Sequence, residues 1–282
     1  MNTKGKVENT PATEFSVLIC VYHGDIPQQL DTALGSIINQ TLQPTEIVLV
    51  QDGPVSDEMS MFIRKWHQEY HGLIRIVRLA ENKGLAKALA YGLEACSFEL
   101  IGRMDADDFS MPTRFQEQLQ FLQNHPDIDV VSSLAGIFQE NPDVVQYVRG
   151  GPTEHRDIVR LAKHRFPMNH PAAMFRKKAV IEAGNYQDFY CLEDYHLWVR
   201  MIIKGSKMAT IPKVLYKFRC DKKLIKRRSG FARTYEQFLL HKYFWNIGFI
   251  SFSQFLQNVI IRTVGCIMPI SVAQRLRARL RI

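Results

Sequence analysis

Three aspartates stand close together near the middle of the chain, at Asp105, Asp107 and Asp108. They follow the mostly apolar run 100–104, which is typical of a buried strand in a parallel sheet. Carboxylates this close repel one another, and Mg²⁺ or Mn²⁺ would compensate the repulsion because hard cations prefer oxygen ligands. We expect a metal site here, with Arg103 pairing with the carboxylates and lowering their pKa values. The alternative is a solvated acidic turn that caps the following helix.

Further carboxylates stand at the ends of other predicted elements, Asp52 after a strand and Glu193–Asp194 before a helix. The carboxyl ends of parallel strands share one edge of an open sheet, where ligands of such sheets bind. The set would suit a site that binds a nucleotide diphosphate, neutralises it with a metal and deprotonates a hydroxyl group, with Asp194 as the base. The alternatives are a tight turn at Asp52 and a favourable charge at a helix N-terminus for Asp194.

The elements that must position these carboxylates alternate between strands and helices over the first part of the chain. Strands are expected at 15–21, 46–51, 73–79 and in the stretch that begins at Glu99, and helices at 28–39, from an N-cap at Ser56 to about Tyr70, at 85–95 and at 113–122. This order and spacing are typical of a doubly wound parallel α/β sheet.

After Asp129 the pattern is less regular. Strands are expected at 130–138, 144–149, 174–176 and 208–216, and helices at 153–163, 177–183, 192–203 and about 235–247. His170 stands in a loop before one of these strands. It either lines the site or forms a structural hydrogen bond.

The composition is that of a globular protein. The chain has 282 residues, 46% of them apolar, which is enough for one large domain or one and a half. Residues 1–14 are polar, so we expect a disordered lead-in rather than a secretory signal. No window of about 18 residues is apolar enough to span a membrane. Five cysteines without a Cys-x-x-Cys pair argue against a disulfide framework or a zinc site and fit a reducing cytosol.

The net charge of +8 is unevenly distributed. Residues 213–282 hold 15 Lys and Arg against two acids, a net charge of +13, whereas residues 1–212 hold 21 basic and 26 acidic residues, a net charge of −5. This asymmetry suggests a polyanionic partner, either an anionic membrane surface or a nucleic acid. Aromatic residues among the basic ones could stack bases. Their helical spacing favours packing instead, so we expect no nucleic-acid partner.

The C-terminal end combines arginine with a helical repeat. Val272, Leu276 and Leu280 recur every four residues, and Pro269 would begin this helix. The arginines are Arg262, Arg275, Arg277, Arg279 and Arg281. Upstream, the apolar but polar-interrupted run 249–268 suits a position in the membrane interface. We expect reversible binding to an anionic membrane; the alternative is a helix packed on the protein with a solvated basic face.

Five segments resemble, in their order and spacing, the landmarks of family 2 glycosyltransferases, which are inverting enzymes that use nucleotide sugars and have the GT-A fold. The segments are Phe15-Ser-Val-Leu-Ile-Cys-Val-Tyr22, Ile47-Val-Leu-Val-Gln-Asp-Gly53, Asn82-Lys-Gly84, Arg103-Met-Asp-Ala-Asp-Asp108 and Glu193-Asp-Tyr-His-Leu-Trp198. The resemblance covers about residues 15–220. It implies an α/β GT-A (Rossmann-like) nucleotide-sugar-binding sheet with flanking helices over 15–220. From the charge and the helical repeat described above, we expect a basic, partly amphipathic helical extension over 221–282 that associates with membranes.

The resemblance also implies roles for single residues. Asp52 would contact the uracil. Asp105 and Asp107 would form the Asp-x-Asp motif that meets ribose, diphosphate and Mn²⁺ or Mg²⁺, with Asp108 as a third candidate metal ligand. Asp194 would be the catalytic base.

Three basic residues complete the expected nucleotide-sugar site. Lys83 lies in a landmark segment, and Arg227 and Arg228 would bind diphosphate. Two departures from the family pattern stand beside them. Gln51 replaces an acid that is often paired with Asp52, and the His motif that many members have after the last strand is missing from the basic stretch that starts at Tyr216.

The most similar subgroup, by length, acidic motif and basic C-terminus, comprises bacterial enzymes of O-antigen and exopolysaccharide repeat-unit assembly. This resemblance implies transfer of a hexose, glucose or galactose, from a UDP-sugar to a polyprenyl-diphosphate-linked sugar, as a β1,3 linkage to N-acetylglucosamine on undecaprenyl diphosphate. The protein would act peripherally at the cytoplasmic face of the inner membrane. Two other classes stay open. One is a nucleic-acid-binding protein, and the other is a metal-dependent nucleotidyltransferase, whose Gly-rich loop with Arg or Lys is not found in Val21-Tyr-His-Gly-Asp25.

Overall fold

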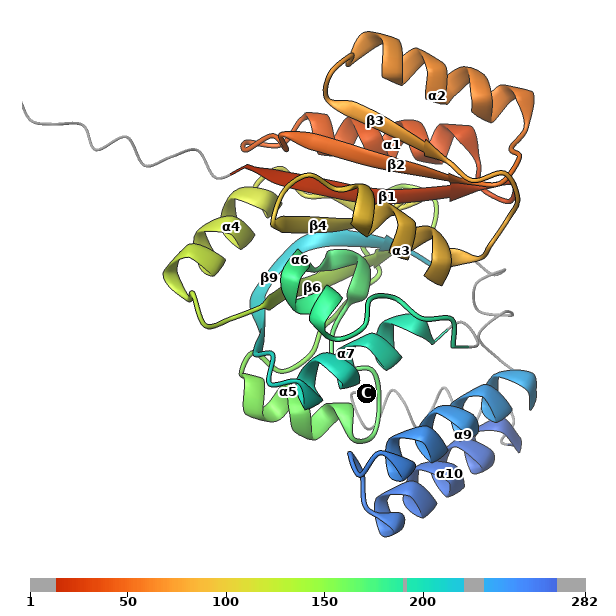
Figure 1. Ribbon diagram of the computed structural model, residues 1–282, viewed down its shortest axis with the longest axis vertical. Coiled ribbons are helices and arrows are strands. Elements are labelled where there is room, and N and C mark those ends of the chain that lie inside the picture. The colour runs from red at the N-terminus through yellow and green to blue at the C-terminus, as the bar shows by residue number, and fades with distance from the viewer. Residues whose placement is uncertain (1–13, 190–191, 221–230, 268–282) are drawn as a thin grey trace, which may run out of the picture.

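Nine strands form one mixed sheet in the part of the chain that the structure describes, residues 14–189, 192–220 and 231–267, and this computed structural model is drawn in Figure 1. The strands are β1 (Phe15–Tyr22), β2 (Glu46–Asp52), β3 (Ile74–Arg78), β4 (Leu100–Asp105), β5 (Phe109–Ser110), β6 (Val130–Phe138), β7 (Tyr147–Arg149), β8 (Met174–Arg176) and β9 (Met208–Arg219). In the sheet they lie in the order β3-β2-β1-β4-β8-β6-β9-β5, and β7 pairs with β6.

The sheet has a parallel half and a mixed half. Strands β3, β2, β1 and β4 are parallel, so their carboxyl ends share one edge. Strand β8 is antiparallel to both β4 and β6, and β9 then runs parallel to β6. Two reversals of direction bring the carboxyl end of β9 back to the edge at which β1, β2 and β4 end.

Helices cover both faces of the sheet (Figure 1). One face carries α1 (Pro27–Ile38), α2 (Asp57–Glu69) and α4 (Arg114–Asn124). The other carries α3 (Leu85–Ala95), α5 (His155–Ala162), α6 (Lys177–Glu182) and α7 (Glu193–Ile203). Residues of β1 show why: Val17 and Ile19 pack into the first layer and Leu18 into the second, all fully buried. A strand buried on both sides needs a nearly continuous apolar run, and β1 provides one over 17–21.

A hairpin of two helices, α9 (Phe231–Asn246) and α10 (Phe252–Ile267), lies at the far end of the molecule (Figure 1). It packs against α5 and α7 through a separate apolar cluster. The buried members of that cluster are Ala162, Leu192, Tyr195, Val199, Leu240, Phe244, Ile250 and Phe255. Within the described ranges, none of the helices is both long and apolar enough to cross a membrane.

Most predicted elements lie where the periodicity put them. Helix α3 and strands β6 and β8 occupy the predicted residues, and Ser56 caps α2 by accepting a hydrogen bond from the backbone N–H of Met59. The parallel sheet is confirmed for β1 to β4. Beyond Asp129 the sheet is mixed, β9 continues past Tyr216 to Arg219, and the strand expected at 144–149 is reduced to Tyr147–Arg149.

Candidate functional site

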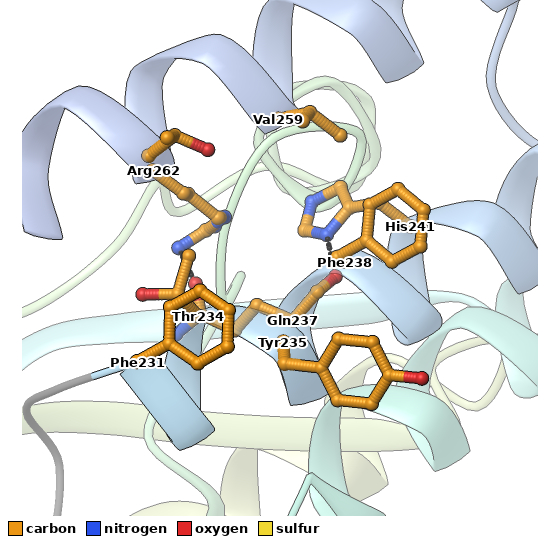
Figure 2. Close-up of a pocket in the computed structure, with 9 residues that line it drawn as sticks. Phe231, Thr234, Tyr235, Gln237, Phe238, His241, Val259 and Arg262 are labelled. Carbon is orange, nitrogen blue, oxygen red and sulfur yellow. Dashed lines mark hydrogen bonds between the residues drawn. The ribbon is translucent and has the colours of Figure 1, made fainter.

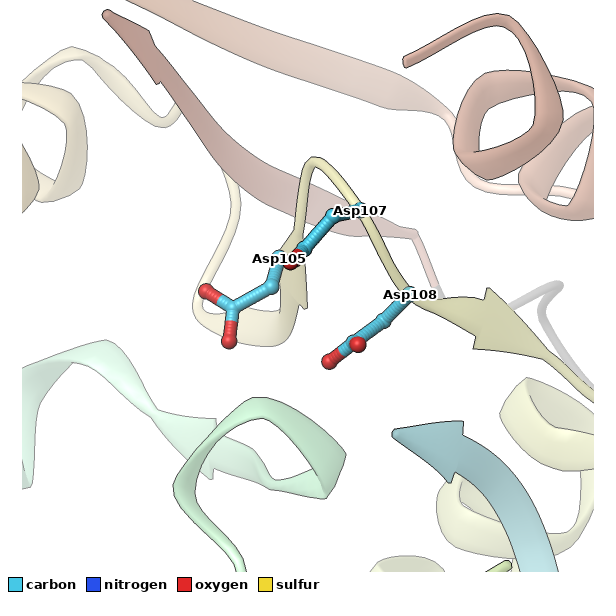
Figure 3. Close-up of side chains that lie close together, drawn as sticks. All are labelled: Asp105, Asp107 and Asp108. Atoms are coloured by element: carbon cyan, nitrogen blue, oxygen red, sulfur yellow. The ribbon is translucent and has the colours of Figure 1, made fainter. Parts of the chain in front are cut away.

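The three aspartates that the sequence singled out lie around the turn between β4 and β5, at the carboxyl edge of the parallel strands (Figure 3). One carboxylate oxygen of each lies within 4.8 Å of the corresponding oxygens of the other two. Asp105 and Asp107 are half-buried, and Asp108 is 1% exposed. An all-oxygen set this tight matches the ligand chemistry of Mg²⁺ or Mn²⁺.

Asp108 is held by protein donors at both of its carboxylate oxygens. The Tyr216 hydroxyl donates to Oδ2 at 2.7 Å, and the backbone N–H of Arg219 donates to Oδ1 at 2.7 Å. The same Tyr216 hydroxyl accepts a hydrogen bond from the backbone N–H of Asp105 at 3.2 Å. Burial and the charges of Asp107 and Asp105 raise the pKa of Asp108 well above its ordinary value. Asp108 therefore ties the acidic turn to β9 and shapes the cluster.

Asp107 has a raised pKa, as expected of a carboxyl group that lies close to other carboxylates. Burial and then the charge of Asp105 raise the pKa of Asp107 to about 6, although Arg219 and Arg103 act in the opposite direction. Arg103 pairs with Asp105 and lowers the pKa of Asp107, as the sequence predicted, but burial and the charge of Asp105 outweigh this effect. A divalent cation would relieve the repulsion between the carboxylates, so the residues present fit a metal.

Arg103 is a fully buried cation under the cluster, 1% exposed, and its guanidinium donates to Asp105 Oδ1 at 2.5 Å. A second buried arginine, Arg114, supports it by donating to the backbone oxygen of Arg103 at 2.7 Å. The guanidinium of Arg114 also lies over the ring of Tyr216, 4.8 Å from its centroid. Burying charge is costly unless it is paired. These contacts fix the acidic turn through one buried ion pair, Arg103–Asp105, and through the hydrogen bonds of Arg114 to neutral acceptors.

Asp52 lies at the end of β2 and is 3% exposed. Its Oδ1 accepts from the backbone N–H of Lys83 at 2.7 Å, and its Oδ2 accepts from that of Gly84 at 3.0 Å. Gly53 has φ +80, and a Cβ there would lie 2.4 Å from the backbone nitrogen of Asn82. The Asp52-Gly53 pair therefore forms the tight turn of the alternative reading and orders the loop that carries Lys83. A carboxylate has four lone-pair sites, so a further donor can still be accepted.

The side chain of Lys83 lies beside this turn and is one-third exposed. Its Nζ is 3.8 Å from Glu81 Oε1 and 5.7 Å from the centroid of the Tyr91 ring. Both contacts are at the surface and weak, so the ammonium can reach an anionic ligand at little cost.

The thiol of Cys20 shows that the β2 and β4 ends are close together. Its pKa is raised to about 12, first by burial and then by the charges of Asp105, Asp52 and Asp25, while Arg103 lowers it. Cys20 pairs with Val50 on one side and with Asp105 on the other. The convergence of Asp52 with the acidic cluster, which the sheet order predicted, is therefore present.

Glu193 and Asp194 begin α7, and the charge of Arg103, which pairs with Asp105, acts on Glu193. Burial and the charge of Asp194 raise the pKa of Glu193 to about 7, whereas Arg103 and Arg233 lower it. Glu193 is 8% exposed, and Asp194 is half-buried, with Oδ1 accepting from the backbone N–H of Tyr195 at 2.7 Å. Glu193 thus lies within the electrostatic reach of Arg103 from the sheet and of Arg233 from α9.

His170 is structural rather than part of an open site. It is buried, and its Nε2 is hydrogen-bonded to the Tyr186 hydroxyl at 2.8 Å. Its ring meets Trp198 edge to face, with centroids 5.5 Å apart. Burial and the charge of Arg103 hold the pKa of His170 well below its ordinary value, so it stays neutral. The structure supports the second of the two readings of this residue.

Tyr216, Arg219 and Arg114 are the site residues that sequence reasoning missed. Tyr216 stands in a predicted strand. The alternation of residues in that strand does not show that the Tyr216 hydroxyl bonds to Asp108 and Asp105, 108 and 111 positions away. Arg114 is the first residue of α4, and nothing in the sequence signalled that this charged side chain is buried. Arg227 and Arg228 lie outside the described residues, as does the helix expected from Pro269.

A pocket of about 160 Å³ lies between α9 and α10, and none of its lining residues belongs to the acidic cluster (Figure 2). Arg262 donates there to Gln237 Oε1 and, at 2.7 Å, to the backbone oxygen of His164. His241 is 1% exposed and bonded at 2.8 Å to the backbone oxygen of Gln237. The bonds of Arg262 join the two helices of the hairpin to each other and to the body of the protein, whereas the bond of His241 lies within α9.

Comparisons with known proteins agree with this geometry. The sequence pattern of "Glycosyl transferase family 2" matches residues 16–184. The chain is 36% identical over 260 residues to "Amylovoran biosynthesis glycosyltransferase AmsE" of Erwinia amylovora, covering 92% of this chain and 96% of that protein. It is 33% identical over 264 residues to "UDP-Gal:alpha-D-GlcNAc-diphosphoundecaprenol beta-1,3-galactosyltransferase" of Escherichia coli, covering 94% of each.

Solved structures share the fold. A mannosyltransferase of Pyrobaculum calidifontis, in complex with GDP-Man and Mn²⁺, superposes with a TM-score of 0.56 over 95% of this chain and 79% of its own. The sequence identity is 17%, so the likeness concerns the fold alone. The predicted GT-A architecture is confirmed.

Proposed function

This chain belongs to glycosyl transferase family 2, and from that premise we propose that it transfers a hexose, glucose or galactose, from a UDP-sugar to a sugar linked to polyprenyl diphosphate. The observation that supports the proposal is the link that Arg103 makes between two sets of acids. Arg103 forms an ion pair with Asp105 of the acidic cluster, and its charge lowers the pKa of Glu193, which stands next to Asp194.

Each residue then has a task in an inverting transfer. The acceptor hydroxyl attacks the anomeric carbon while the bond from that carbon to the UDP oxygen breaks. Asp194 takes the proton of the attacking hydroxyl, so a single base suffices. Glu193 is the second candidate for this role. A divalent cation held by Asp105 and Asp107 would offset the charge of the departing diphosphate.

The proposed binding residues fall into two groups. One contacts the uracil ring, and the other offsets the negative charge of the diphosphate. Asp52 accepts from the uracil ring in this proposal and keeps the loop of Lys83 in place through the two bonds it already makes. Lys83 contributes positive charge, as do Arg227 and Arg228 of the sequence. Asp108 holds the acidic turn on β9 and is the least available of the three acids, because both its oxygens accept bonds.

The acceptor and the pathway are inferred from relatives. The Escherichia coli relative is named for galactose transfer from UDP-Gal to GlcNAc-diphosphoundecaprenol, and the Erwinia relative for amylovoran biosynthesis. Near-complete coverage of both chains supports the same class of substrate here, with a β1,3 linkage to GlcNAc-diphospho-undecaprenol as the specific proposal. The place would be the cytoplasmic face of the inner membrane, and the product a repeat unit of O-antigen or exopolysaccharide. Neither nucleotidyl transfer nor nucleic-acid binding is favoured by the family.

The test combines a donor panel with an acceptor panel. UDP-glucose, UDP-galactose and their N-acetyl forms are incubated with GlcNAc-diphospho-lipid, with Mn²⁺, Mg²⁺ or excess EDTA, and products are identified by mass spectrometry. We expect a gain of one hexose with UDP-glucose or UDP-galactose and none in EDTA. Full transfer in EDTA would contradict the metal assignment. Transfer only of an N-acetylhexosamine would contradict the donor assignment.

A further inference from the structure

The outer side of α10 exposes four large apolar side chains. Phe252, Leu256, Ile260 and Ile261 are 52%, 42%, 60% and 60% exposed. The first three recur every four residues and therefore share one side of the helix. We propose that this set, here called the α10 face, docks onto the surface of an anionic lipid bilayer. Contiguous exposed apolar residues of this kind mark interaction surfaces in soluble folds.

The α10 face is not the side that the protein itself covers. Phe255 and Asn258 point inward from the same helix and are 7% and 3% exposed. Phe255 joins the apolar cluster against α5 and α7, and Asn258 donates to the backbone oxygen of Lys163 at 2.8 Å. Arg262 and His241 project into the space between α9 and α10, and Arg262 fixes the hairpin by donating to Gln237 of α9 (Figure 2). The hairpin is thus anchored on one side and open on the other.

The charge of the sequence around the hairpin selects a lipid surface as the occupant. After Glu236 the chain contains no Asp or Glu. Five Lys and Arg occupy 222–228 before α9, and four Arg occupy 275–281 after α10. The exposed polar residues between members of the α10 face are uncharged, Ser253 and Gln257. An apolar stripe between basic segments is the pattern of a helix that lies in the bilayer interface. Each basic residue near an anionic leaflet strengthens binding about fivefold.

Aromatic residues at the tip of the hairpin extend this surface. Trp245 is 38% exposed, and its ring lies 5.1 Å from that of Phe252, centroid to centroid. Ile247 in the connection is 39% exposed. Trp side chains are enriched at the level of lipid headgroups because an apolar ring carries a polar N–H. The tip and the α10 face thus offer one apolar surface to the bilayer.

The location of the hairpin connects this surface to the acidic edge. Helix α9 packs on α7 through Leu240 and Phe244, and α7 begins with Glu193–Asp194. The charge of Arg233 on α9 reaches Glu193. A docked hairpin would hold the N-terminus of α7 close to the bilayer, where a lipid-linked acceptor has its headgroup. Only this benefit rests on the proposed function; the docking itself does not.

Co-sedimentation of the full chain with vesicles tests the proposal. The vesicles contain phosphatidylethanolamine with 30% phosphatidylglycerol or are phosphatidylcholine alone. We expect binding to the anionic vesicles that is at least tenfold stronger than to the neutral ones. The double variant L256E/I260E should bind the anionic vesicles at least tenfold more weakly than the unchanged chain. The matched control M61E/I181E makes the same charge change at side chains that are 64% and 42% exposed on α2 and α6, and it should bind normally.

The outcomes are separable. L256E/I260E binding as well as the control would overturn the role of the α10 face, and equal binding to both kinds of vesicle would overturn the preference for anionic lipid. A dimer in sedimentation that L256E/I260E dissociates, together with no vesicle binding, would show a second copy as the occupant and also overturn the proposal. Unchanged UDP binding and circular dichroism of both variants establish that they fold. A failure of sugar transfer leaves the vesicle result unaffected.

Discussion

The acidic edge of the sheet, which carries Asp52, Asp105, Asp107 and Asp108, and the α9–α10 hairpin differ in what they bury and what they expose. At the edge, Arg103, Arg114 and Asp108 are charged or ionisable and at most 1% exposed. On the hairpin, Phe252 and Ile260 are apolar and more than half exposed. Each arrangement costs free energy in an isolated monomer, the first through desolvation and the second through water contact. The difference indicates that the edge is shaped for a charged ligand and the hairpin for an apolar surface.

The largest expected effect comes from removing a carboxylate at the edge. Asp107→Ala should lower kcat/KM for sugar transfer by a factor of about 10³ or more, because stabilising the charge of a leaving diphosphate contributes several kcal/mol. Excess EDTA should abolish transfer by the unchanged chain. Vesicle binding should stay the same, since the hairpin does not depend on the cluster.

The control for that variant is Asp143→Ala, which removes an exposed carboxylate paired with Lys217. It should transfer sugar at a rate close to that of the unchanged chain. If Asp107→Ala retained more than a tenth of the activity, the acidic cluster would be a structural turn. The claim that the sheet edge is shaped for a charged ligand would then be wrong.

A smaller but still large effect is expected at the start of α7. Asp194→Asn keeps the shape of the side chain and removes its basicity, so transfer should fall by about 10²–10³-fold, the usual contribution of a positioned base. Affinity for UDP, measured by calorimetry, should change less than about threefold because Asp194 serves the acceptor. Asp157→Asn on the exposed side of α5 is the control. Tenfold weaker UDP binding by Asp194→Asn would show that the base is misassigned, and Glu193 would be the next candidate.

The sequence predicted which carboxylates lie at the sheet edge better than it predicted which side chains hold them in place. Strand ends are visible as apolar runs that stop at Asp52 and Asp105, and parallel topology brings such ends together. Local periodicity does not tell which distant side chain completes a hydrogen bond. The link from Tyr216 to Asp108 spans 108 residues. It depends on two features of the topology: β8 is antiparallel to both β4 and β6, which makes β6 parallel to β4, and β9 is parallel to β6.

The direction of the pKa shifts of the clustered aspartates could not be predicted from the sequence either. A neighbouring Arg103 suggested lowered carboxylate pKa values, but the sequence does not give depth of burial, and burial is the largest influence on both Asp107 and Asp108. The hairpin shows a similar limit. The apolar run 249–268 suggested a position in the membrane interface and no helix, and only the structure shows α10 there, with Phe255 buried and Phe252 exposed.

Glu193 is affected by Arg103 of the sheet and by Arg233 of the hairpin, so its effect on stability as a function of pH tests how the two regions interact. Its folded-state pKa of about 7 lies above the ordinary 4.5, so the folded chain binds this proton more tightly than the unfolded chain. With respect to this group the protein is therefore most stable below pH 4.5, where Glu193 is protonated in both states. Stability falls as pH rises through 4.5–7, and above 7 the buried charge of Glu193 is a constant cost. Glu193→Gln removes that cost, worth at most about 3 kcal/mol.

Thermal unfolding of Glu193→Gln should therefore show a raised Tm at pH 8 and no difference from the unchanged chain at pH 4.5. Glu182→Gln, at an exposed position of α6, should show no difference at either pH. A Tm gain that is equal at both pH values would mean that the amide improves packing and that the charge of Glu193 carries no cost.

The smallest expected effect concerns how the hairpin is attached. Asn258 donates to the backbone oxygen of Lys163 at 2.8 Å, and its Oδ1 is hydrogen-bonded to His164 Nδ1 at 3.0 Å. Asn258→Ala leaves both partners unpaired in a buried place, at a cost of roughly 1–2 kcal/mol. If the hairpin opens as a local unit, amides of α9 and α10 should exchange hydrogen about 5–30 times faster while those of β1–β4 keep their rates. Gln257→Ala, at the exposed neighbouring position, should change neither set. Equal acceleration in β1–β4 would show that hairpin and sheet unfold together, and the two regions would then be one cooperative unit despite their different composition.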